Sequence, residues 1–98
     1  DVYKRQIRDG ETLSFQYHRK KEGAIHVLEG VLGMETESGG DRVLLSLEPG
    51  ETFHVTPGTR HRMFASAGDV LIVEVSSPEL DDVVRLEDRY GREGTSQP

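Results

Sequence analysis

The chain has 98 residues, with 18 acidic and 12 basic side chains and a formal net charge of −6. This length is that of one domain, and the acidic balance argues against a nucleic-acid partner. The absence of cysteine excludes disulfides and thiolate ligands, and the absence of a long apolar run or a signal peptide predicts a cytoplasmic protein without a membrane partner.

Turn-forming residues recur roughly every ten positions, with β-branched and aromatic residues between them. This spacing predicts an all-β sandwich or barrel. Closing the sheet would remove its open edges and let a short chain bury both apolar rows. The predicted strands are residues 2–7, 12–18, 24–29, 31–37, 42–47, 52–55, 60–66 and 69–76.

The C-terminal part carries a different pattern. Its apolar residues are spaced as on one face of a helix, namely Leu80, Val83, Val84 and Leu86. Pro78 suits the first turn of a helix, because its fixed φ is helical and its missing N–H would have no partner there. We therefore expect a short helical segment within residues 78–89.

The domain is expected to extend over residues 1–90, with a flexible tail over 91–98. Residues 1–6 have the sequence DVYKRQ, which resembles a string that recurs at the ends of translated environmental sequence reads. This resemblance leaves open whether the first predicted strand is native.

Two histidines are placed on predicted strands where they could do chemistry. His18 ends the second predicted strand, and His61 follows a Pro57-Gly58 turn. Proline presets the bend of such a turn, and glycine supplies a positive φ. An imidazole held on a rigid sheet can ligate a metal ion or transfer a proton.

The residues around these histidines resemble the two sequence motifs of the cupins. The second motif is matched by Gly50, Gly58 and His61, and part of the first by Gln16, His18 and Gly30. Residues 74–92 resemble the end of the cupin domain of type II mannose-6-phosphate isomerases. The resemblance implies a cupin-type double-stranded β-helix, that is, a jelly-roll barrel.

The resemblance also implies a divalent metal ion, Mn, Zn, Fe or Ni, held by Gln16, His18 and His61. Cupins use two histidines, a glutamate and a later histidine, but Gln16 stands at the first histidine position and Gly23 at the glutamate position. Because the missing carboxylate removes the strongest anionic contact, the alternative is a degenerate pocket. There the histidines would hydrogen-bond each other, water or a ligand.

Basic residues adjoin both histidines, and they are Arg19, Lys20, Lys21, Arg60 and Arg62. If the histidines converge, these cations could form a rim that binds a small anionic molecule. We predict ligand-binding roles for Arg19, Lys20, Lys21 and Arg60. Strand alternation favours the opposite for the two residues that flank His61, because it directs Arg60 and Arg62 to the outer face.

Glu74 is a carboxylate inside an otherwise apolar strand. Burying it requires a partner, and Arg85 or a histidine is the expected one. Glu74 could then share an acid/base role with His61, or it could anchor the C-terminal segment.

The resemblance implies isomerisation of a sugar or sugar phosphate, with His61 and Glu74 as catalytic candidates. One alternative is a non-catalytic cupin that binds or senses a small anionic molecule. A second alternative is a metal-dependent dioxygenase, which needs a firmly held redox metal. A homodimer is expected in each case, as for many cupins.

Overall fold

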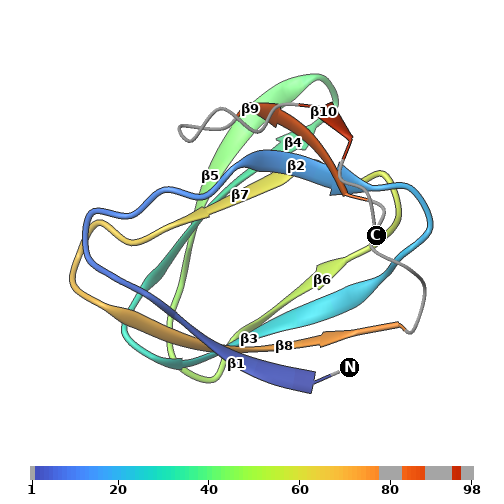
Figure 1. Cartoon of the computed structure of the whole chain (residues 1–98). Coiled ribbons are helices and arrows are strands. Elements are labelled where there is room, and N and C mark those ends of the chain that lie inside the picture. Colours follow the sequence, from blue (N-terminus) through green and yellow to red (C-terminus); the bar gives the residue numbers. More distant parts are fainter. Residues whose placement is uncertain (1, 78–82, 88–93, 96–98) are drawn as a thin grey trace.

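The computed structural model describes residues 2–77, 83–87 and 94–95. These residues form two antiparallel sheets that face each other, as the upper and lower layers in Figure 1. The strands are β1 (Val2–Ile7), β2 (Phe15–His18), β3 (Gly23–Glu29), β4 (Leu32–Ser38), β5 (Asp41–Leu47), β6 (Thr52–Val55), β7 (His61–Phe64), β8 (Val70–Ser76), β9 (Val83–Glu87) and β10 (Gly94–Thr95). No helix in these ranges could span a membrane.

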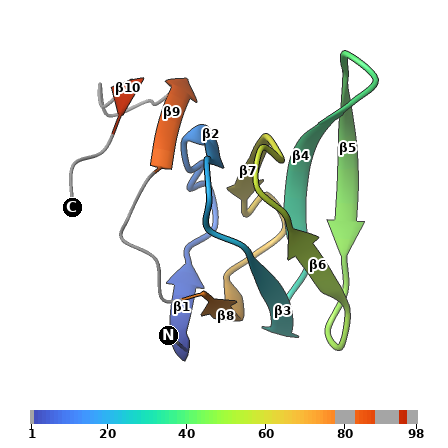
Figure 2. The same ribbon diagram turned by 90° about the vertical axis from the view of Figure 1, so that its right-hand side faces the viewer.

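The order of the strands can be followed from left to right in Figure 2. One sheet has the order β1-β8-β3-β6, and the other has the order β10-β9-β2-β7-β4-β5. Most neighbours within a sheet are distant in sequence, so successive strands pass from one sheet to the other. The prediction of an all-β sandwich or barrel is confirmed.

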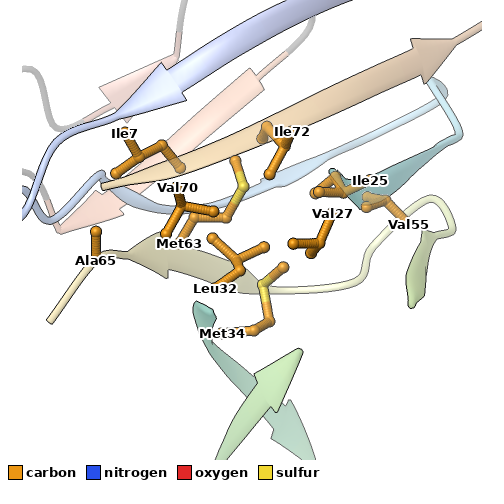
Figure 3. Close-up of a cluster of buried hydrophobic side chains, with 10 residues drawn as sticks. All are labelled: Ile7, Ile25, Val27, Leu32, Met34, Val55, Met63, Ala65, Val70 and Ile72. Atoms are coloured by element: carbon orange, nitrogen blue, oxygen red, sulfur yellow. The ribbon is translucent and has the colours of Figure 1, made fainter. Parts of the chain in front are cut away.

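The core lies between the sheets, where alternate residues of the strands point inward (Figure 3). On β3, for example, Ile25 and Val27 are buried, whereas His26 between them faces outward and hydrogen-bonds Thr52. The core residues are Ile7, Ile25, Val27, Leu32, Met34, Val55, Met63, Ala65, Val70 and Ile72. Three of them, Ile25, Val55 and Met63, also line a cavity between the sheets.

The predicted helical segment is wrong where the structure describes it. Residues 83–87 form strand β9, which pairs with β2, and 78–82, 88 and 89 lie outside the described residues. Val83 and Val84 are β-branched and suit a strand, and pairing with β9 satisfies the free edge of β2. Within the expected tail of residues 91–98, Gly94–Thr95 form β10 beside β9, and 91–93 and 96–98 lie outside the described residues, so the flexible tail stays a prediction.

Candidate functional site

A cavity of about 300 Å³ lies between the two sheets. Its wall includes residues of β1, β2, β3, β7, β8 and β9, so both sheets and chain segments far apart in sequence build it. Among its lining residues are Gln16, His18, Lys21, His61, Glu74 and Arg85. Its volume is at the lower end for ligand pockets, which suits a molecule of monosaccharide size.

The two histidines meet on the wall of this cavity. Their ring centroids are 6.1 Å apart, and the ring planes are inclined by 37°. Gln16 is the register partner of His61 across the β2–β7 pair, and His18 is two residues further along β2. The strand alternation therefore directs both Gln16 and His18 inward, as expected from sequence.

The turn before β7 holds His61 in place. Gly58 has a φ of 84° and donates its N–H to the carbonyl of His18 at 2.7 Å, which ties the turn to the end of β2. The Nδ1 of His61 lies 3.1 Å from the carbonyl oxygen of Thr59. Because a carbonyl can only accept, Nδ1 carries the hydrogen and Nε2 keeps its lone pair.

His61 is only 3% exposed. Burial lowers the pKa of the His61 imidazole, and the nearby His18 lowers it further, although the hydrogen bond to Thr59 opposes the shift. The imidazole is consequently neutral near pH 7. A neutral, oriented imidazole on a cavity wall can accept a proton from a bound molecule.

This burial predicts a pH-dependent stability difference. The pKa of His61 is lower in the folded chain than the unfolded value of about 6.5, so the unfolded chain binds more protons as the pH falls below that value. We expect the wild type to be more stable than His61→Asn at pH 7, and this difference in the free energy of unfolding to shrink between pH 7 and pH 5. Urea unfolding at pH 7, 6 and 5 measures this, and a difference that stays constant or grows would contradict it.

A β-bulge in the β2–β9 pair sets which charges face the cavity. Phe15 pairs with Glu87, but the next residue, Gln16, pairs with Arg85, so β9 has one extra residue at this point. The bulge breaks the alternation along β9. Arg85 lines the cavity beside Gln16, whereas Glu87 forms ion pairs with Arg42 and Arg62 elsewhere.

Glu74 lines the cavity, but its partner differs from the expected one. Its Oε2 lies 3.1 Å from the Nε of Arg5 on β1, the strand that pairs with β8. Burial and the Glu74 carboxylate raise the pKa of the neighbouring Tyr3. The expected partnership with Arg85 or a histidine is not among the described contacts.

The predicted basic rim assembles only in part. Lys21 lines the cavity, whereas Arg19 and Lys20 are exposed residues outside its lining. Arg60 is also outside it, since its guanidinium lies 5.3 Å from the Tyr17 ring centroid and pairs with Glu37 at 3.6 Å. Arg60 is therefore an outer-face residue, as the strand alternation indicated.

The described donors fit a divalent metal ion poorly. No group of three or more His, Cys, Asp or Glu within the described ranges is placed to hold one. An ion about 2.0–2.1 Å from a ring nitrogen of each histidine, at a tetrahedral angle, would bring the ring centroids to about 5.3 Å, whereas those of His18 and His61 are 6.1 Å apart.

Gln16 and Gly23 do not repair this donor set. The Oε1 of Gln16, the atom that a metal would need, accepts a hydrogen bond from the hydroxyl of Ser14. At Gly23, where cupins carry a glutamate, a Cβ would lie 2.2 Å from the carbonyl oxygen of Val75. Neither position supplies the anionic ligand that the site lacks.

Arg85 is the cavity residue that sequence reasoning placed incorrectly. The sequence predicts it, or a histidine, as the partner of Glu74, whereas its pairing with Gln16 on β2 brings it to the cavity wall. The only signal was its sequence proximity to valines of strand-forming type.

Solved structures share this fold. A protein with a double-stranded β-helix domain from Klebsiella pneumoniae is 18% identical with a TM-score of 0.74, over 86% of this chain and 71% of its own. The QdtA 3,4-ketoisomerase from Thermoanaerobacterium thermosaccharolyticum is 18% identical with a TM-score of 0.75, over 87% and 64%. A cupin-2 domain protein from Shewanella frigidimarina is 17% identical with a TM-score of 0.66, over 80% and 69%.

These likenesses confirm the predicted cupin fold, and the chain spans less than two thirds of the ketoisomerase. The narrower resemblance to type II mannose-6-phosphate isomerases stays a prediction. A search of proteins with curated descriptions found no match. Residues 7–90 match the sequence model of D-lyxose isomerase. Since this match extends over most of the chain, the protein belongs to the D-lyxose isomerase family.

Proposed function

We propose that this protein binds a small anionic sugar, a sugar phosphate in the first place, and interconverts its aldose and ketose forms by proton transfer. The observation that carries the proposal is the pair of imidazoles, His18 and His61, on the wall of a monosaccharide-sized cavity. Membership of a sugar isomerase family supports the reaction class. One structural neighbour is also described as a ketoisomerase.

The geometry suits the chemistry of such an isomerisation. A base removes the proton from the carbon next to the carbonyl, the C–H electron pair forms the C=C bond of an enediolate, and the carbonyl pair moves to oxygen. The hydroxyl proton passes between the two adjacent oxygens, and the base returns its proton to the former carbonyl carbon. We assign the base to Nε2 of His61, because Nδ1 is engaged with Thr59. With Oε1 of Gln16 bonded to Ser14, its amide nitrogen remains a donor for a substrate oxygen.

The charge of the cavity supports an anionic substrate. Its described lining holds three cations, Arg5, Lys21 and Arg85, and two carboxylates, Glu22 and Glu74. The chain as a whole has a net charge of −6, so a lining with more cations than carboxylates is a local exception. Such a lining favours a phosphate or carboxylate over a neutral sugar.

Two alternatives use the same cavity. A non-catalytic cupin would bind the sugar without converting it, and the loss of the metal-binding glutamate at Gly23 favours this reading over a metal-dependent isomerase. A dioxygenase requires a firmly held redox metal, which the described donors do not favour. The homodimer and the cytoplasmic location also remain predictions.

The proposal is tested by incubating chelator-treated protein in D₂O with D-lyxose, with D-mannose and with D-mannose 6-phosphate. NMR spectroscopy should show the matching ketose, with deuterium incorporated at C1, the former carbonyl carbon that receives the proton. Binding without conversion would select the non-catalytic alternative. Conversion only after Mn²⁺ is restored would contradict an isomerisation by the side chains alone. The absence of both binding and conversion would reject the proposal.

A further inference from the structure

Arg85 places a positive charge in the cavity without a described counter-charge. The side chain lines the cavity, and its Nε is buried with no hydrogen-bond acceptor among the described residues. Within residues 2–77, 83–87 and 94–95, no ion pair includes Arg85. Its guanidinium is therefore desolvated in part and not neutralised by this portion of the chain.

The nearby carboxylates have other partners. Glu74, on the opposite sheet, pairs with Arg5 at 3.1 Å. Glu87, two residues along β9, is turned away by the bulge and pairs with Arg42 and Arg62. Glu22, the remaining carboxylate of the described lining, is exposed to solvent. As far as the described part of the chain goes, Arg85 is therefore open to a negative charge that enters the cavity.

We propose that Arg85 anchors the anionic head group of the sugar that this cavity binds, and thereby selects a sugar phosphate or a sugar acid over a neutral sugar. This inference rests on the proposed function, because it concerns the same cavity. A buried charge without a partner is unfavourable, and an incoming anion removes that cost. The planar guanidinium presents parallel N–H donors that match two oxygens of a phosphate or carboxylate.

The position of Arg85 also fits a head-group anchor. It is the register partner of Gln16, which in turn is the register partner of His61. The three residues therefore stand side by side on β9, β2 and β7, with the cation at one end of the row and the proposed base at the other. A sugar can lie along this row, with its charged end at Arg85 and its carbonyl end towards His61.

The test compares binding of D-mannose 6-phosphate, D-mannuronate and D-mannose by titration calorimetry, with the wild type and with Arg85→Met. We expect the wild type to bind one of the two anionic sugars at least about 30-fold more tightly than D-mannose, and Arg85→Met to lose that preference. The two anionic probes distinguish a phosphate site from a carboxylate site. Arg85→Lys keeps the charge but lacks the parallel N–H donors of the guanidinium, so it should bind the anionic sugar with intermediate affinity.

Arg8→Met is the matched control, because it removes the charge of an exposed arginine outside the cavity lining. Its affinities should equal those of the wild type. Without ligand, Arg85→Met should also unfold at a higher temperature than the wild type, since it removes a partly buried charge that has no ion pair among the described residues. A purely structural role for Arg85 predicts the opposite shift.

The outcomes separate this inference from the proposed function. If the wild type binds D-mannose as tightly as both anionic sugars, or if Arg85→Met keeps the preference, the role of Arg85 is rejected while sugar binding survives. If none of the three sugars binds, the proposed function fails as well. If Arg85→Met does not fold, the wild-type preference and the affinities of Arg85→Lys test the role of Arg85 instead.

Discussion

Replacing His61 by asparagine is expected to lower kcat/KM for the aldose–ketose interconversion by about 10²–10⁴-fold, the usual contribution of a positioned general base. The amide nitrogen of asparagine can take the place of Nδ1 and still donate to the Thr59 carbonyl, so the turn should keep its structure. The Nε2 atom, which we assign as the base, is lost. Steady-state kinetics should show the fall in kcat, with little change in KM.

His26→Asn is the matched control for this experiment. His26 faces outward on β3, hydrogen-bonds Thr52 and is not one of the residues that line the cavity. The same substitution there should leave kcat and KM unchanged. If His61→Asn retained activity within about threefold of the wild type, another residue would be the base, because positioned bases contribute far more than this.

Replacing Gly23 by glutamate, which would restore the carboxylate of the cupin motif, is expected to destabilise the fold by about 3 kcal/mol and to give no tighter Mn²⁺ binding. A Cβ at this position would lie 2.2 Å from the Val75 carbonyl oxygen and 3.1 Å from the Cα of Ser76. These are backbone atoms of β8, so neither can rotate away. Urea unfolding measures the stability, and calorimetry measures the affinity for Mn²⁺.

Two alanine variants separate steric overlap from backbone strain as causes of the lost stability. Gly23→Ala adds only the Cβ and should show most of the destabilisation. Gly50→Ala adds a Cβ that meets no atom within 4 Å, but at a φ of 95°, and should cost about 1–2 kcal/mol from backbone strain alone. If Gly23→Glu were as stable as the wild type and bound Mn²⁺ more tightly, β3 and β8 would be further apart than described.

Local sequence patterns were sufficient for the faces of single strands. The alternation on β2 predicts that Gln16 and His18 point the same way, and both line the cavity. The same rule predicts the outward position of Arg60, which lies over Tyr17. It succeeds because successive side chains of a strand point to opposite faces whatever the strand pairs with.

Side-chain alternation along one strand does not predict features that depend on how that strand pairs with its neighbour. A bulge is an extra residue relative to the neighbouring strand, so the one that turns Glu87 away from the cavity while Arg85 lines it exists only in the β2–β9 pair. The same holds for Glu74, whose partner Arg5 is brought close by the β1–β8 pairing.

The sequence by itself determined that this protein is all-β and carries two inward-facing imidazoles, because turn spacing and side-chain alternation are local properties of the chain. Only the tertiary structure decided that residues 83–87 form a strand, that Lys21 alone of the basic residues after His18 lines the cavity, and that Arg85 lines the same cavity as the histidines. The reason is that these features depend on contacts between segments far apart in the chain. Such contacts pair the edges of strands and bring charged side chains together. The residues next to each segment in the sequence do not show which segments will meet.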